Sequence, residues 1–314
     1  MLPDLKTIEV AASRIAPYIN HTPVLTSSYL NTLSGADIYF KCENFQKAGA
    51  FKSRGACNVV FSLGEDDIRK GVCTHSSGNH AQALARAAAI RGCNAYIVMP
   101  ETAPQVKVDA VKGYGGIVTF CKPTLAAREE TLRQVMEETG ATEIHPYNDY
   151  RIIAGQATAA MELIQSAGNL DIIMSPVGGG GLLSGTALAT KYLSPSTRVI
   201  AGEPMGADDA CRSLMTRQIV PSVNPNTIAD GLLTSLGTLT FPIILEHVEQ
   251  ILTVPEETII RAMKLIWERM KIIVEPSSAV PFGAILDNPE TFRGKRTGVI
   301  LSGGNVNLDK LPWH

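Results

Sequence analysis

The chain has 314 residues, 45% hydrophobic and 18% charged, with 28 Lys+Arg against 30 Asp+Glu and a formal net charge of −2. This composition excludes disordered, collagen-like and disulfide-rich proteins, and the near-neutral charge gives no field that would attract a nucleic acid or an anionic membrane. A single core stops growing near ~250–300 residues, so we expect two domains. The start carries Asp4, Lys6 and Glu9 instead of an apolar signal sequence, and no stretch reaches the ~18 apolar residues of a membrane helix, so we expect a cytoplasmic protein.

The first 70 residues predict a helix at Ile8–Tyr18, an extended segment at Pro23–Leu25 and a strand at Asp37–Cys42. From about residue 70, strands and helices alternate at the spacing of right-handed βαβ units, which predicts an α/β fold. The strands expected in the first run are Gly71–Ser76, Asn94–Pro100, Ile117–Phe120 and Thr142–His145, and the helices are Asn79–Ile90, Pro104–Lys112 and Ala126–Glu138. This run makes a complete four-stranded parallel sheet by itself.

The same alternation resumes after Tyr147-Asn148-Asp149 and predicts a second sheet. Its expected helices are Ala154–Ser166, Gly181–Leu193, Ala207–Arg217 and Glu256–Met270, and its strands are Asp171–Pro176, Thr197–Glu203 and Gly298–Leu301. We assign the N-terminal strand to this second sheet, because the first is complete without it. The sequence thus predicts a small α/β domain, residues 71–147, inserted into a large domain of residues 1–70 and 148–314, with twisted, mostly parallel sheets and helices on both faces.

Four successive glycines, Gly178 to Gly181, followed by Leu182, lie between a predicted strand and a predicted helix. Such a loop lets several backbone N–H groups point at one anion while the helix N-terminus adds partial positive charge. The loop lacks the Lys-Ser/Thr of a nucleotide P-loop and the spacing of a dinucleotide fingerprint, so a monophosphate fits better. A glycine-rich packing turn is the alternative.

A second strand-to-helix junction reads Ser76-Ser77-Gly78-Asn79-His80, rich in hydroxyl and amide groups. It can hold a substrate carboxylate through backbone N–H and serine donors, although its serine and asparagine are also common helix caps. Lys52, beside Phe51, is the third candidate; alone it would pass for a surface lysine. Carboxyl ends of parallel strands gather ligands, so we expect these segments to converge.

Phe51-Lys52, Ser76–His80, the tetraglycine loop and Ser302-Gly303-Gly304-Asn305 stand in the order found in the fold-type II pyridoxal-phosphate enzymes, which share the fold of the tryptophan synthase β subunit. The resemblance runs from Thr22 to about Asp309. Within that family the chain is most similar to the serine racemases and their dehydratase relatives.

The resemblance implies that Lys52 forms the Schiff base with the cofactor and takes the α-proton of the substrate on one face, with Ser77 as the acid/base on the other face. It implies that Gly178, Gly179, Gly180, Gly181 and Leu182 bind the phosphate, that Asn79 binds the phenolic oxygen, that Phe51 packs on the ring, and that Ser302 meets the pyridine nitrogen. The implied substrate-binding residues are Ser76, Ser77, Gly78, Asn79, His80, Arg128 and Asp230.

A hydroxyl at Ser302 cannot hold a proton on the pyridine nitrogen as an aspartate does, so the ring is a weaker electron sink and loss of a β-hydroxyl competes. We therefore expect racemisation of serine together with β-elimination from serine or related β-hydroxy amino acids, giving a keto acid and ammonia. The alternative within the family is a threonine or 3-hydroxyaspartate dehydratase with little racemase activity. Outside this activity, a nucleotide-binding α/β protein and a non-catalytic amino-acid sensor stay open.

The resemblance also implies a metal site formed by Glu203, the carbonyl of Ala207, and Asp209, whose oxygen ligands suit Mg²⁺ or Ca²⁺. Read alone, acids at a helix start simply complement the helix dipole. Ser27, Ser28 and Lys47 match part of a nucleotide-effector site, but Ala48 replaces its threonine, which argues against regulation by ATP. A homodimer is the assembly that the family implies.

Overall fold

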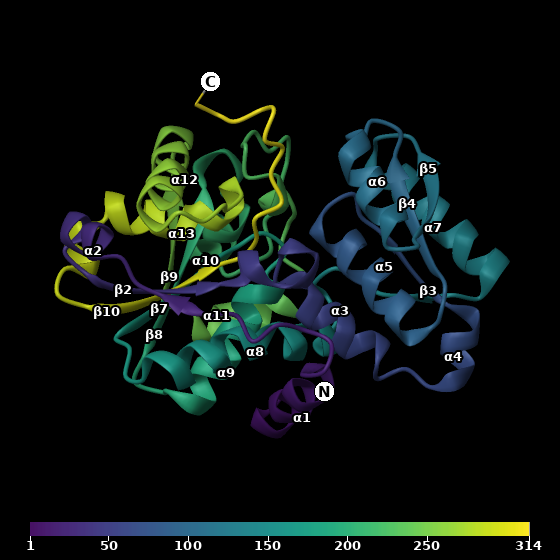
Figure 1. Ribbon diagram of the computed structural model, residues 1–314, viewed down its shortest axis with the longest axis horizontal. Helices are drawn as coiled ribbons and strands as arrows, with labels where there is room; N and C mark the ends of the chain where they lie inside the picture. Colours follow the sequence, from purple (N-terminus) through teal and green to yellow (C-terminus); the bar gives the residue numbers. More distant parts are fainter. Residues whose placement is uncertain (314) are drawn as a thin grey trace.

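The computed structural model describes residues 1–313 and contains two β-sheets (Figure 1). The six-stranded sheet has the order β1-β2-β10-β7-β8-β9, and the four-stranded sheet has the order β5-β4-β3-β6. Neighbouring strands are parallel except β1 and β2, which pair antiparallel. The strands are β1 Val24–Leu25, β2 Asp37–Cys42, β3 Val72–His75, β4 Ala95–Pro100, β5 Ile117–Cys121, β6 Thr142–Glu143, β7 Ile172–Pro176, β8 Arg198–Pro204, β9 Gln250–Val254 and β10 Arg296–Leu301.

Helices cover both faces of each sheet. The α-helices are α1 Leu5–Ile15, α2 Ser28–Ser34, α3 Lys52–Val60, α4 Glu65–Lys70, α5 Asn79–Arg91, α6 Gln105–Gly113, α7 Leu125–Thr139, α8 Tyr150–Ala167, α9 Gly181–Leu193, α10 Asp209–Thr216, α11 Thr240–His247, α12 Glu256–Met270, α13 Pro276–Asp287 and α14 Pro289–Phe292. Short 3₁₀ turns lie at η1 Glu43–Phe45, η2 Lys47–Gly49, η3 Met205–Ala207 and η4 Asp230–Leu232. In Figure 1, α12 and α13 lie above the six-stranded sheet, and α8 and α9 lie below it.

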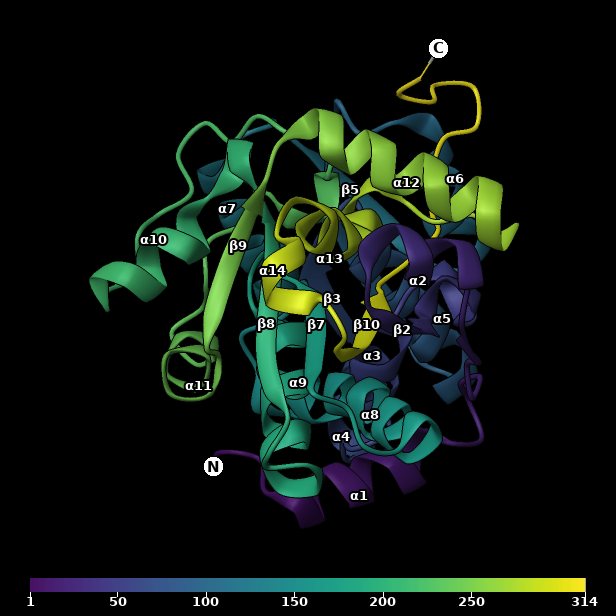
Figure 2. The same cartoon turned by 90° about the vertical axis from the view of Figure 1, so that its left-hand side faces the viewer.

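Alternating side chains of the central strands explain why both faces are covered. In β7, Ile172 and Met174 pack into the core between the sheet and helices α12 and α13. Ile173 packs into the core on the other face, between the sheet and helices α8 and α9. Because successive side chains of a strand point to opposite faces, a strand that is apolar throughout must be buried on both. Figure 2 shows β9, β8 and β7 side by side, in the hydrogen-bonded order.

The α/β class, the parallel four-stranded sheet and the place of β2 in the six-stranded sheet agree with the sequence, and the structure adds that β2 lies beside β10. The first helix begins earlier than expected, because the side chain of Asp4 accepts a hydrogen bond from the amide of Thr7 and caps it. The helix expected at Ala207–Arg217 begins only at Asp209, after the 3₁₀ turn η3. The division of the chain into domains at residues 70 and 148 stays a prediction.

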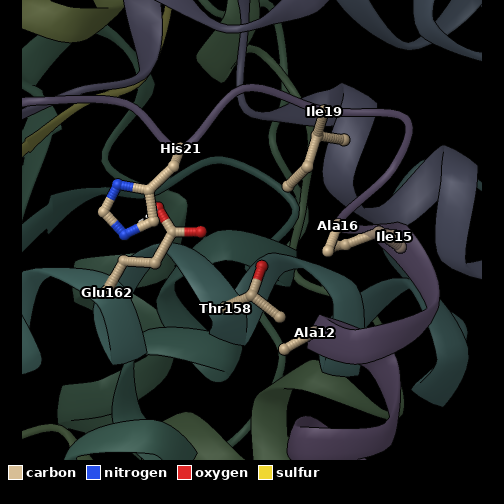
Figure 3. A pocket seen from close by; sticks show the side chains of 7 residues that line it. All are labelled: Ala12, Ile15, Ala16, Ile19, His21, Thr158 and Glu162. Atoms are coloured by element: carbon tan, nitrogen blue, oxygen red, sulfur yellow. Dashed lines mark ion pairs between the residues drawn. The ribbon is translucent and has the colours of Figure 1, made fainter.

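Helix α3, which begins at Lys52, is fixed by a buried cluster of four charged side chains. Arg54 donates to both carboxylate oxygens of Glu43 and to both of Glu162, and Lys41 donates to Glu162. The cluster is neutral overall, which is the condition under which buried charges are tolerated. Glu162 also borders a hollow of about 90 Å³ between α1 and α8, where it faces His21 (Figure 3). The predicted site residues do not line this hollow.

Among residues 1–313, no helix is both long and apolar enough to cross a membrane.

Candidate active site

The segment before Lys52 is joined directly to the segment that carries Ser302. The amide of Phe51 donates to the carbonyl of Ser302 at 3.0 Å, and Ala50 forms an isolated antiparallel bridge with Gly303. Because Ser302 directly follows β10, these backbone bonds place the start of α3 at the carboxyl end of the central strands. Two of the four predicted motifs therefore lie in contact.

Lys52 is the first residue of α3, and its amine points at the loop that follows β6. Its Nζ donates to the carbonyl of Pro146 at 2.9 Å and lies 5.1 Å from the centroid of the Phe51 ring. Burial lowers the pKa of Lys52 to about 8, although the charge of Glu275 acts to raise it. An amine in this range is neutral often enough near physiological pH to act as a nucleophile and as a base.

The tetraglycine loop joins β7 to α9, and the structure has no room for side chains along it. A Cβ at Gly178 would lie 2.9 Å from the backbone Cα of Leu232, and one at Gly181 would lie 2.9 Å from Tyr147 Cβ. Gly180 has a φ of +88°, in the left-handed region that favours glycine. The first amides of α9 have no acceptor within their own helix, so this loop fits a phosphate group.

The loop between β3 and α5 holds Ser76, Ser77 and Gly78, all half-buried. The amide of Gly78 donates to the hydroxyl of Ser76 at 3.3 Å. His80 is buried, and its Nε2 lies 3.0 Å from the carbonyl of Ile144; since a carbonyl only accepts, Nε2 carries the proton. Burial lowers the pKa of His80 to about 3, so the ring is neutral. A substrate carboxylate would therefore be bound here by hydroxyl and amide groups.

Glu275 is a buried carboxylate that the sequence did not reveal as a site residue. Asn79 Nδ2 donates to its two oxygens at 2.9 and 3.1 Å, and the amide of Asn305 donates to it at 3.2 Å. Asn305 Nδ2 in turn donates to Asn79 Oδ1 at 2.9 Å, so the Asn79 side chain is held at both ends. Burial raises the pKa of Glu275 to about 7. The one local sequence signal near Glu275 was Pro276, which indicates the start of a helix directly after Glu275, since proline favours the first position of a helix.

Ser302 is buried, and its hydroxyl meets another hydroxyl. Its Oγ lies 3.1 Å from Ser278 Oγ, which also donates to the carbonyl of Gly303 at 2.7 Å. Either hydroxyl can be the donor in the Ser278–Ser302 pair. Both groups are neutral, and a cofactor nitrogen beside Ser302 would meet a hydroxyl group.

Two further candidates, Arg128 and Asp230, lie on different elements. Arg128, on α7, has a buried Nε without a hydrogen-bond partner, and its charge adds to the burial that lowers the pKa of His75. Asp230, in η4, forms an ion pair with Lys107 of α6. This pair links the segment before α11 to a helix of the four-stranded sheet, and Lys107 was not expected from the sequence.

The predicted metal ligands lie near the end of β8 (Glu203), in η3 (Ala207) and at the start of α10 (Asp209). The Glu203 carboxylate accepts hydrogen bonds from the backbone amides of Ala210 and Cys211, both at 2.8 Å. Both carboxylate oxygens of Asp209 are buried without a hydrogen-bond partner. Burial raises the pKa of Glu203 to about 8 and that of Asp209 to about 6, although the nearby hydroxyl of Ser222 acts to lower the pKa of Asp209. Nowhere in residues 1–313 do three or more His, Cys, Asp or Glu side chains gather as a metal-binding group. The carboxylate oxygens of Asp209, which have no hydrogen-bond partner, nevertheless fit a hard cation.

A half-buried lysine with a lowered pKa and a glycine loop at a helix N-terminus both lie at the carboxyl ends of parallel strands. Together they define an α/β enzyme with a phosphate-bearing cofactor. Residues 15–303 match the family described as "Pyridoxal-phosphate dependent enzyme". The protein belongs to this family, in its fold-type II branch.

The similarity to known proteins extends over nearly the whole length of the chain. The β-hydroxyaspartate dehydratase of Paracoccus denitrificans (strain Pd 1222) is 53% identical over 313 residues, which cover 100% of this chain and 99% of that protein. The serine racemase of Dictyostelium discoideum is 53% identical, with 98% of this chain and 96% of that protein covered. Its crystal structure superposes with a TM-score of 0.94 over 97% of this chain and 99% of that one.

Proposed function

We propose that the protein racemises serine and also catalyses β-elimination of water from serine or related β-hydroxy amino acids, giving a keto acid and ammonia. The observation that carries the proposal is the half-buried amine of Lys52, hydrogen-bonded to the Pro146 carbonyl and with a pKa of about 8, in a segment bonded to the Ser302 loop. The similarity to a serine racemase and to a β-hydroxyaspartate dehydratase supports the same pair of activities.

Pyridoxal phosphate, when bound, supplies an electron sink that acidifies the α-proton of an amino acid. In this proposal Gly178 to Gly181 and Leu182 hold its phosphate, and Phe51, Asn79 and Ser302 hold its ring. Lys52 moves the α-proton on one face and Ser77 on the other, because inversion needs one group to remove a proton and a second to return it. The neutral hydroxyl of Ser302 favours elimination beside racemisation, since it stabilises negative charge on the substrate carbon less than an acid partner would.

A dehydratase for threonine or 3-hydroxyaspartate with little racemase activity is the second candidate. Arg128 favours it, because a buried guanidinium nitrogen without a partner can pair with the extra carboxylate of 3-hydroxyaspartate. The same arginine can instead meet the α-carboxylate that all these substrates share. Keto-acid formation from serine, threonine and each isomer of 3-hydroxyaspartate, measured together with chiral analysis of the remaining serine, separates the two. The absence of D-serine from L-serine would refute the racemase activity.

Replacing Ser77 with alanine tests its part in the reaction. We expect the Ser77→Ala variant to lose at least about a hundredfold in racemisation of L-serine, because the second face lacks its acid/base. Elimination from L-serine should survive in large part, since it needs proton removal on the Lys52 face alone. Lys52→Ala is the control and should lose both activities. Equal loss of both activities in Ser77→Ala would instead assign Ser77 to substrate binding.

We also propose that Glu203, the carbonyl of Ala207, and Asp209 bind Mg²⁺ or Ca²⁺. The two oxygens of Asp209 are buried without a hydrogen bond, which costs free energy unless a cation or a proton neutralises them. Glu203 is already oriented by two backbone amides, so one ligand is preorganised.

A homodimer completes the proposal, whereas the residues at the matching positions argue against an ATP effector. Tyr29 and Leu33 of α2 are exposed apolar side chains, as expected for a face that a second copy covers. For ATP, Lys47 is exposed, but the hydroxyl of Ser27 accepts the amide of Leu30 as a helix cap and Ala48 offers no hydroxyl group. Light scattering of the purified protein, with and without ATP, tests the assembly, and calorimetric titration tests ATP binding.

A further inference from the structure

The carbonyl that accepts the hydrogen bond from the Lys52 amine belongs to Pro146. Lys52 Nζ donates to the Pro146 oxygen at 2.9 Å. A peptide carbonyl accepts a hydrogen bond and does not take the proton, so this contact orients the amine without neutralising it. Pro146 has a fixed φ and no N–H of its own, so the position of its oxygen depends on the residues on either side.

His145 holds the residues that follow Pro146. Its Nδ1 accepts hydrogen bonds from the backbone amides of Asn148, at 2.8 Å, and Tyr147, at 3.2 Å. A ring nitrogen that accepts two N–H groups carries no proton, so the ring is neutral with its proton on Nε2. Burial, with the charges of His75 and Lys52, lowers the pKa of His145 to about 4, so the acceptor persists at physiological pH.

The remaining polar groups of this segment are also bonded. Asn148 Oδ1 accepts the amide of Leu239 at 2.8 Å, and the side chain of Asp149 caps α8 by accepting the amide of Arg151 at 2.7 Å. On the other side, His80 Nε2 donates to the Ile144 carbonyl at 3.0 Å. The Pro146 carbonyl is therefore held between fixed neighbours, and His145 provides the bonds nearest to it.

We infer that His145 is a positioning residue for Lys52: it fixes the 145–148 turn so that the Pro146 carbonyl aims the amine. The inference rests on the proposed function, in which that amine moves the α-proton. Aim matters for this step, because a misplacement of about 1 Å can cost on the order of 100-fold in rate. His145 acts through the backbone and needs no contact with the substrate.

Two variants separate the acceptor from the bulk of the ring. Asn carries an oxygen at the δ position and can accept amides two and three residues ahead, as in an Asx-turn, so His145→Asn should keep the turn. His145→Leu fills similar space without an acceptor. In the pyridoxal-phosphate-loaded protein we expect the Tyr147 and Asn148 amides to exchange with solvent at least about tenfold faster in His145→Leu, and at the wild-type rate in His145→Asn. His21→Leu, at an exposed histidine, is the control and should match the wild type.

The kinetic arm uses L-serine. We expect kcat to fall about tenfold in His145→Leu with KM and the cofactor absorbance unchanged, and to recover in His145→Asn. If His145→Leu does not fold, His145→Gln, whose oxygen lies one methylene further out, must show the faster exchange. Wild-type exchange in the variant without the acceptor, or a kcat in His145→Asn as low as in His145→Leu, would overturn the inference. A wild-type protein inactive on serine would refute the proposed function alone, because the exchange data would still decide on the turn.

Discussion

Burial decides how reactive Lys52 is, because it lowers the pKa of the amine to about 8 from an ordinary value of 10.5. The amine is then half neutral near pH 8, whereas an exposed lysine reaches that point near pH ~10.4. We expect the rate at which cofactor-free protein takes up pyridoxal phosphate to rise roughly tenfold per pH unit below pH 8 and to level off above it. Stopped-flow measurement of the near-visible absorbance checks this. A rate that still climbs at pH 10 would mean that the amine is exposed.

Single residues could be predicted where the chemistry lies in a contiguous motif. Lys52, the tetraglycine loop and Ser302 each stand in such a motif, and the structure brings Lys52 and Ser302 into adjoining segments. Glu275 and Pro146 were missed, because their partners are distant in sequence: Asn79 and Glu275 are 196 residues apart, and Lys52 and Pro146 are 94 apart. Contacts of this kind exist only once the two sheets are packed together, so one sequence does not reveal them.

The tetraglycine loop is closely packed against the segments that contain Leu232 and Tyr147. At Gly178 a methyl group would meet the backbone of Leu232 at 2.9 Å, and backbone atoms cannot move aside as a flexible side chain can. We expect Gly178→Ala to cost about 1–3 kcal/mol through this overpacking and to weaken pyridoxal-phosphate binding at least tenfold. Titration of the near-visible absorbance measures the affinity.

Gly64 gives the matched control for this substitution. A Cβ there meets no atom within 4 Å and its φ is −71°, so Gly64→Ala should leave cofactor affinity unchanged. Wild-type affinity in Gly178→Ala would mean that the loop yields and that its glycines are packing residues only.

At the level of elements, the sequence pattern found α12 and the buried helix α9 with their exact bounds, but it missed α13. Helix α12 matches its predicted range, because it has one apolar and one polar face. Helix α13 was not predicted: residues from Ser277 to Ile285 are all buried, so no polar face alternates, and Pro281 lies inside it. Yet α13 begins directly after Glu275 and carries Ser278, so the helix that escaped the pattern supports two sides of the site.

At the scale of the whole molecule, the site needs both sheets. Ser76 to Asn79 follow β3 of the four-stranded sheet, whereas the tetraglycine loop and Ser302 follow β7 and β10 of the six-stranded sheet. The hydrogen bonds from Asn79 to Glu275 and the ion pair of Lys107 with Asp230 cross between them. The ion pair is partly exposed, so it contributes little to stability.

The proposed metal site predicts that the stability of the whole molecule depends on a cation. A ligand that binds only the folded state stabilises it by mass action, by about 2.7 kcal/mol at a hundredfold excess over Kd. We therefore expect Mg²⁺ to raise the Tm of the wild-type protein in a concentration-dependent way and to leave that of Asp209→Asn unchanged. Without metal, Asp209→Asn should be at least as stable as the wild type, because it removes a buried carboxylate whose oxygens have no partner.

Asp208 supplies the control, since it is the neighbouring acid and is half-exposed in an ion pair with Arg212. Asp208→Asn removes the same charge from the same helix start, so a general electrostatic effect of Mg²⁺ would weaken equally in both variants. A cation bound at Asp209 would still raise the Tm of Asp208→Asn as it does that of the wild type. Thermal melts with and without Mg²⁺, repeated with Ca²⁺, measure this difference, and equal responses in the two variants would place the cation elsewhere.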